Sequence, residues 1–204
     1  MQMALLDWVA QPGNNTAMQQ VDTLYQDIPK QQVDFQLKDL ERSIHRQRNM
    51  LDHLNVINLN FQDPLEAKIS CDFLCELFPD PSRAKLGIME LFINAIEHGN
   101  LGISYEEKHT LLAENRWMEE ITHRLSDPAN NEKRVHAYCY RDPAYTRITI
   151  RDDGEGFDWR PYESMTAHDT LNGRGIAVAK HISFDEMGYY DQGNIVYGMQ
   201  YQKE

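Results

Sequence analysis

The stretch LGIMELFINAIEHGN, residues 86–100, decides how the rest of the chain is interpreted. Glu90 and Asn94 are four residues apart, so on a helix both project from one face, about one turn from each other. The core side of this helix carries an apolar stripe of Met89, Phe92, Ile93 and Ile96. We expect Ser82 to cap the helix and Gly99 to end it. A carboxylate and a carboxamide held in this way can position a metal and activate a hydroxyl. Taken alone, however, the pair is better explained as part of a polar helix face.

Composition narrows the class of protein. The chain has 204 residues, of which 41% are hydrophobic, enough for one domain with a real core and an appendage. A net charge of −12 without any basic block argues against nucleic acid and anionic membranes as partners. The N-terminus lacks the features of a signal peptide, and no apolar run could span a bilayer, so we expect a cytoplasmic protein. Three cysteines suit a reducing compartment, and buried packing explains them better than a metal: Cys71, Cys75 and Cys139.

The first 54 residues are expected to form an N-terminal extension to a domain at 55–204. A short helix is expected at 16–25, and a longer one at 33–54 has an apolar seam with a spacing of three to four residues. The seam consists of Leu37, Leu40, Ile44, Leu51 and Leu54. It could make the chain a homodimer, or it could pack against the same domain, and the sequence leaves both interpretations open.

The remaining elements predict a layered fold. Alternating apolar residues indicate strands at 56–61, 135–140 and 145–150, and two short strands near 184–189 and 194–201 are expected to close the chain around Gln192-Gly193. Helices are expected at 65–78 and from residue 175 to about 181, and a helical insertion covers about 103–132. Because most helices precede most strands, we expect an α/β fold of the α+β two-layer sandwich type. Its mixed, largely antiparallel sheet should have helices on one face.

Two glycine-rich turns should meet the helix of Glu90 and Asn94. One is DDGEG at 152–156, which follows a strand, and the other is GRG at 173–175, which opens a helix. Glycine lets backbone N–H groups approach a phosphate, and a helix N-terminus favours negative charge. Asp152 could accept a hydrogen bond from an exocyclic amine such as that of adenine. Neither turn is a P-loop or a full dinucleotide-binding fingerprint.

The ordered set of E-x-x-x-N, D-x-G-x-G and G-x-G resembles the GHKL superfamily of ATP-binding domains, which share the Bergerat fold. The resemblance covers about residues 55–201. Within the superfamily, the chain looks most like the anti-sigma-factor serine kinases of bacterial partner-switching systems. The features that carry this likeness are Asn94-Ala95 followed by His98-Gly99, the stretch 152–158, a short lid at 159–172, and Gly193-Asn194-x-Val196.

The resemblance implies ATP and Mg²⁺ as cofactors and a role for each motif residue. Glu90 would be the general base and Asn94 the ligand of Mg²⁺. Asp152 would bind the adenine amine, and Gly154 and Gly156 would leave room for the ring. The phosphates would lie on Gly173, Arg174 and Gly175. His98 and Ile176 complete the predicted nucleotide-binding set, although closing its helix is the simpler role for His98.

The function implied is phosphorylation of a Ser or Thr on a STAS-type anti-anti-sigma partner, or sequestration of a sigma factor. One rival is the catalytic half of a histidine kinase, but His45 is followed by Arg46, Gln47 and Arg48 instead of an acid. A second rival is a nucleotide-dependent binding module without turnover. A structural coiled-coil protein is a third rival, which leaves the glycine motifs unexplained. Two features depart from the family pattern: the insertion at 103–132, and Asn194 where many members have Thr.

Overall fold

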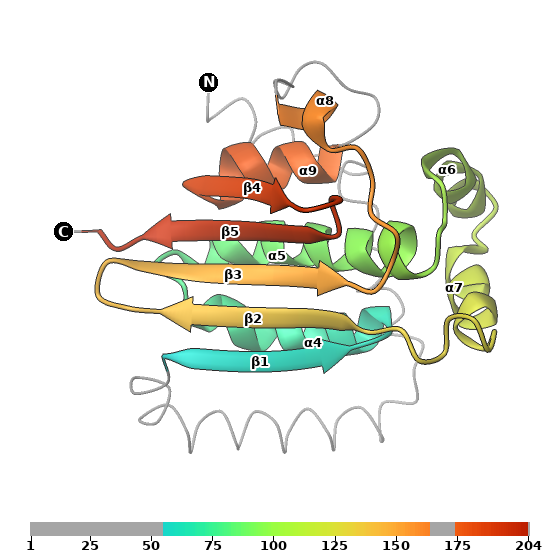
Figure 1. Ribbon diagram of the computed structural model, residues 1–204, viewed down its shortest axis with the longest axis horizontal. Coiled ribbons are helices and arrows are strands. Elements are labelled where there is room, and N and C mark those ends of the chain that lie inside the picture. Colours follow the sequence, from blue (N-terminus) through green and yellow to red (C-terminus); the bar gives the residue numbers. More distant parts are fainter. Residues whose placement is uncertain (1–54, 164–173, 204) are drawn as a thin grey trace.

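The computed structural model describes residues 55–163 and 174–203. The expected N-terminal extension, with its helices at 16–25 and 33–54, therefore lies outside the described residues, as does much of the expected lid. The described chain forms one five-stranded sheet with the strand order β1-β2-β3-β5-β4 (Figure 1). The strands are β1 (Val56–Phe61), β2 (Val135–Arg141), β3 (Tyr145–Asp152), β4 (Glu186–Tyr190) and β5 (Ile195–Tyr201). All five agree with the predicted strands to within two residues at either end.

Helices cover one face of this sheet, which confirms the α+β two-layer arrangement (Figure 1). The covering helices are α4 (Pro64–Leu74), α5 (Pro81–Asn94) and α9 (Arg174–Val178). A 3₁₀ turn η1 (Cys75–Leu77) follows α4, and π-helical turns extend α5 and α9 as η2 (Ala95–Asn100) and η3 (Ala179–Ser183). The expectation of a mixed sheet was wrong, because every neighbouring pair in the described sheet is antiparallel. The helices between β1 and β2 return the chain so that β2 enters antiparallel to β1.

The core lies between the sheet and these helices. On β3 the alternation predicted from the sequence places Ile148 and Ile150 inward, each fully buried. Phe61 of β1 packs against Phe92 of α5 with ring centroids 4.4 Å apart. Burial of such side chains contributes about 1.5–3 kcal/mol each, so this layer fixes how α5 lies on the sheet. The three cysteines are buried and unpaired, which confirms their predicted role in packing.

Both ends of the α5 helix differ from the sequence prediction. Its N-cap is Asp80, whose Oδ1 accepts a hydrogen bond from Arg83 N at 3.1 Å, and Ser82 lies inside the helix. Pro81 is the first helical residue, where its fixed φ is already helical and its missing N–H costs nothing. Gly99 does not end the helix, because η2 runs on to Asn100. The chain turns away at Gly102, which has a φ of +60°.

The insertion folds as two short helices at the end of the sheet, α6 (Tyr105–Ala113) and α7 (Trp117–Leu125). Ser104 and Glu107 form a capping box at the start of α6, and Asn115, with a φ of 56°, separates the two helices. Figure 1 shows the pair beside the end of α5, apart from the layer of α4 and α9. A further short helix, α8 (Arg160–Glu163), lies at the start of the expected lid. In the described part of the chain, no helix is long and apolar enough to cross a membrane.

Candidate functional site

The η2 turn that extends α5 and the turn after β3 touch each other directly. Asp152 is the last residue of β3, and its side chain lies against the backbone of Gly99. A Cβ atom at Gly99 would collide with the Asp152 carboxyl group, and one at Gly154 would collide with the Gly99 carbonyl oxygen. Only glycine at both positions permits this approach. Two motifs about fifty residues apart in sequence therefore form one corner of the fold, as predicted.

The carboxyl group of Asp152 is half-buried in this corner. Its Oδ1 accepts a hydrogen bond from Gly154 N at 3.0 Å. Burial raises the pKa of Asp152 to about 6, and this backbone hydrogen bond and the charge of Lys133 only partly offset the effect. Perturbed carboxyl groups of this kind are concentrated at functional sites.

Asn194, one of the two sequence features singled out above, contacts the main chain of Asp152. Its carbonyl oxygen accepts a hydrogen bond from Asp152 N at 3.1 Å. Its Nδ2 donates to Asp152 O at 3.5 Å. Both contacts hold the main chain of Asp152 in place, and none of the hydrogen bonds among the described residues joins Asn194 to the Asp152 carboxyl group.

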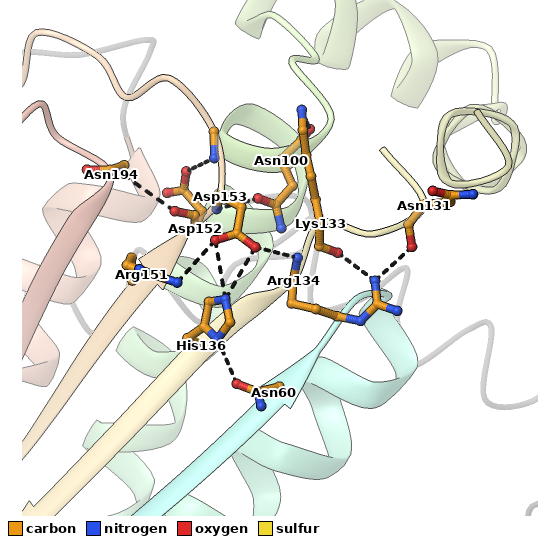
Figure 2. Close-up of polar contacts among 11 residues, drawn as sticks. Asn60, Asn100, Asn131, Lys133, Arg134, His136, Arg151, Asp152, Asp153 and Asn194 are labelled. Carbon is orange, nitrogen blue, oxygen red and sulfur yellow. Dashed lines mark hydrogen bonds and ion pairs between the residues drawn. The ribbon is translucent and has the colours of Figure 1, made fainter. Parts of the chain in front are cut away.

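The neighbouring acid, Asp153, points the other way and is fully engaged (Figure 2). Its Oδ2 accepts from Arg134 N at 3.0 Å and lies 3.2 Å from His136 Nε2, and its Oδ1 accepts from Arg151 at 3.3 Å. Burial acts to raise the pKa of Asp153, but the Arg134 N–H and the side chains of His136 and Arg151 lower it below its ordinary value. Asp153 thus fixes the turn.

Asn100 is a further residue of this corner that sequence reasoning missed. It is 3% exposed, its Oδ1 accepts from Asp153 N at 2.7 Å, and its carbonyl oxygen accepts from Lys133 Nζ at 2.8 Å (Figure 2). Its Nδ2 is buried and has no partner among the described residues. The available signal was its place directly after Gly99, where an Asn side chain can bond to a neighbouring turn.

A second contact joins α5 to the start of α9. A Cβ atom at Gly175 would lie 2.5 Å from Glu90 Oε2, so the Glu90 carboxyl group rests against the backbone of the second GRG glycine. Burial raises the pKa of Glu90; the ammonium group of Lys108 opposes this shift and the carboxylate of Glu97 adds to it. Asn94 is half-buried one turn further along α5. Neither Glu90 nor Asn94 has a side-chain hydrogen-bond partner within residues 55–163 and 174–203.

Two other predicted residues, His98 and Gly156, contact other parts of the chain. His98 Nδ1 lies 2.5 Å from Ile103 O, and its ring stacks beside Tyr105, so His98 faces the insertion. Gly156 has a φ of +81° and approaches the Gln192 carbonyl oxygen so closely that a Cβ atom would collide with it. The space left by Gly154 and Gly156 is thus taken up by the protein's own backbone.

At the remaining predicted motif, Ile176 is half-buried in α9, which begins at Arg174. Gly173 and the Arg174 side chain lie outside what the structure describes. The structure therefore brings the helix of Glu90 and Asn94 together with Asp152 on one side and with Gly175 on the other.

Glu97 is the most deeply buried acid near these residues, and sequence reasoning missed it as well. It is 0% exposed, and its carboxylate accepts hydrogen bonds from Trp117 Nε1 and from Lys108 Nζ, the latter at 2.5 Å. The signal was in the helix pattern: Glu97 follows Ile93 by four residues and so falls on the apolar stripe. An acid in that stripe needs a partner from elsewhere in the chain.

Glu90 of α5 contacts Gly175, and Gly99 of η2 contacts Asp152. The two are nine positions apart, which on an ideal α-helix corresponds to roughly 13 Å, a distance that an extended nucleoside triphosphate can span. At one end the carboxyl group of Asp152 can accept a hydrogen bond. At the other end the carboxyl group of Glu90 lies beside the start of α9. Comparison with known proteins adds nothing to this geometry: no protein-family model matches the chain, and the curated proteins contain no significant match.

Proposed function

We propose that this chain binds Mg·ATP as a Bergerat-fold member of the GHKL superfamily. The observation that carries the proposal is a pair of contacts: Gly99 of η2 with Asp152, and Glu90 of α5 with Gly175. Through these contacts the two glycine-rich turns meet the helix that carries Glu90 and Asn94, which supports the proposal. The adenine would bind at Asp152 and the phosphates at the start of α9.

The residues present suit ATP and Mg²⁺. Asp152 keeps a half-buried carboxyl group with few competing donors, which suits an acceptor for the adenine amine. Asn94 offers a carboxamide oxygen, a ligand type that Mg²⁺ accepts, on the same helix as Glu90. Bound Mg²⁺ would supply charge neutralisation that this acidic chain, at −12, cannot supply from its own side chains alone.

We further propose that the chain is a cytoplasmic serine/threonine protein kinase. Glu90 would take the proton of an attacking hydroxyl as its oxygen bonds to the γ-phosphorus and ADP leaves. Burial of Glu90 raises its pKa, which makes its carboxylate a stronger base than an exposed one. The resemblance suggests a STAS-type anti-anti-sigma protein as the phosphorylated partner, or a sigma factor as a sequestered one.

Two measurements test this proposal in sequence. Calorimetry on the full chain should show binding of ATP and ADP in the presence of Mg²⁺. Incubation with labelled ATP and candidate STAS domains should then label a Ser or Thr of the partner. Absence of nucleotide binding would refute the assignment of the site, whereas binding without transfer to any candidate would favour a nucleotide-dependent binding module.

A further inference from the structure

The insertion supplies the two hydrogen-bond donors of the Glu97 carboxylate, and His98 Nε2 from the same helical turn as Glu97 lies 3.9 Å from its Oε2. Lys108 comes from α6 and Trp117 from α7, and together they bond to the two carboxylate oxygens of a side chain with no exposed surface. Lys108 is itself only 15% exposed at its side chain. Taking a carboxylate out of water is costly unless a cation and hydrogen-bond donors replace the solvent. The insertion thus completes the charge balance of the helix that it packs against.

This ion pair lies between the two ends of the candidate site. Glu97 belongs to the η2 turn, after Asn94 and before Gly99, which touches Asp152. At the end where Glu90 contacts Gly175, both charges act on the pKa of Glu90: Lys108 lowers it and Glu97 raises it. Any charge left uncompensated at Glu97 would therefore be felt where the phosphates are proposed to bind.

We propose that Lys108 is a positioning residue of the nucleotide site, which acts through Glu97 and does not touch the nucleotide. It cancels the buried negative charge of Glu97, so that the region beside Glu90 and Asn94 can accept a polyphosphate. The inference rests on the proposed function, since it concerns the same site. It gives the insertion a task in nucleotide binding, in addition to any task in recognising a partner.

A purely structural ion pair makes a different prediction from this one. If the pair only holds α6 and α7 in place, removal of either partner should weaken nucleotide binding. If its charge matters, the two removals should act in opposite directions, because one leaves a negative charge and the other a positive charge. The sign of the change in affinity therefore separates the two explanations.

The experiment measures the Kd of Mg·ATP by calorimetry at pH 8 for four full-length variants. Lys108→Met should weaken binding at least tenfold, and Glu97→Gln should leave it unchanged or tighten it. The double variant Glu97→Gln/Lys108→Met, which is neutral again, should return to within about threefold of the wild type. Circular dichroism melts record whether each variant is folded.

The matched control is Arg124→Met. Arg124 of α7 contacts Glu107 of α6 and the carbonyl oxygen of Leu101, and it pairs with Glu120 within its own helix, but none of these contacts involves Glu97. This variant should lower the melting temperature of the protein while its Kd stays within threefold of the wild type.

Weakened binding in both single variants, or an unchanged Kd in Lys108→Met, would overturn the inference while the proposed function stands. If Lys108→Met does not fold, weaker binding by Glu97→Gln or by the double variant overturns it in the same way. A wild-type chain that binds no Mg·ATP would overturn the proposed function, and the inference with it.

Discussion

Two neighbouring acids at the end of β3 have opposite environments, and the difference separates what the turn needs for folding from what it offers to a ligand. Asp153, on the outer side, accepts from the Arg134 N–H and contacts His136 and Arg151, and its pKa is lowered. Asp152, on the side of α5, has one backbone hydrogen bond to its carboxylate, and burial raises its pKa to about 6. A carboxyl group held partly out of water without an ion-pair contact in the described structure is costly to the fold, which is the expected signature of a binding group.

Glu90 belongs with Asp152 in this comparison, since burial raises its pKa too. The largest expected effect is therefore on turnover. Glu90→Gln keeps the shape of the side chain but cannot take a proton, so phosphoryl transfer should fall by about 10²–10⁴ while nucleotide affinity stays near that of the wild type. The check is to measure binding and turnover on the same preparation.

Asn94→Ala is the partner variant for that experiment. A ligand of Mg²⁺ acts in the ground state as well as in the transition state, so this variant should lose Mg²⁺-dependent affinity together with turnover. Equal loss of binding in Glu90→Gln and Asn94→Ala would show that Glu90 has a structural role. Undiminished transfer in Glu90→Gln would place the base elsewhere.

The next largest effect concerns Asp152 itself. Asp152→Asn removes a charged acceptor from a half-buried position, which should cost about 1–3 kcal/mol of nucleotide binding, or roughly 5- to 150-fold in Kd. Calorimetry with ADP measures it. Unchanged affinity in this variant would remove Asp152 from the adenine site.

The same substitution should stabilise the fold, because the raised pKa shows that the folded state disfavours the ionised form. The sign follows from linkage: the native state binds the proton more tightly than the unfolded state, so wild-type stability declines as the pH rises from about 4 to about 6. Asp152→Asn should lack this decline and unfold at a higher denaturant concentration at pH 7. The advantage should vanish near pH 4, and its persistence there would point to a cause other than ionisation.

A smaller effect is expected from pH alone. Nucleotide affinity should fall as Asp152 is protonated below pH about 6, by roughly tenfold one unit below that value. The Asp152→Asn variant serves as the control, because its affinity should change with pH only through the nucleotide's own phosphates. Parallel pH profiles in the wild type and the variant would show that Asp152 does not titrate in the binding reaction.

The sequence predicted the strands and the convergence of the motifs because both depend on local patterns. Alternation fixed the core face of β3, and glycines at 99, 154 and 175 marked backbone approaches that allow no side chain. The errors concern longer-range or competing signals. Asp80 and Ser82 are both good N-caps, and only Pro81 at the first helical position decides between them. The π-helical turn continues the helix past Gly99, and the helical periodicity of the sequence does not predict a π-helical turn.

Glu97 shows where local patterns stop being informative. Its place on the apolar stripe marked it as unusual, but its partners Lys108 and Trp117 are 11 and 20 residues away, on helices whose packing the sequence does not specify. The mixed sheet was wrong for a related reason, since the direction of β2 depends on how the intervening helices return the chain. Tertiary contacts of this kind are set by the whole fold.

The smallest expected effect is that of Asp153→Asn on the stability of the fold. Asp153→Asn keeps one acceptor oxygen but removes the charge that faces His136 and Arg151, so it should destabilise the fold by at most about 1 kcal/mol. Its stabilising contribution is present above the unfolded pKa of about 3.9 and is lost as the pH falls through the lower folded value, so the deficit of the variant should be present at neutral pH and shrink towards pH 3. Nucleotide affinity should remain within about twofold of the wild type.

Denaturant titrations across this pH range, paired with calorimetry, compare the two variants directly. Asp152→Asn should stabilise the fold and Asp153→Asn should destabilise it, and only Asp152→Asn should lose nucleotide binding. A loss of binding in Asp153→Asn as large as that in Asp152→Asn would mean that the whole turn, and not one free carboxyl group, recognises the ligand.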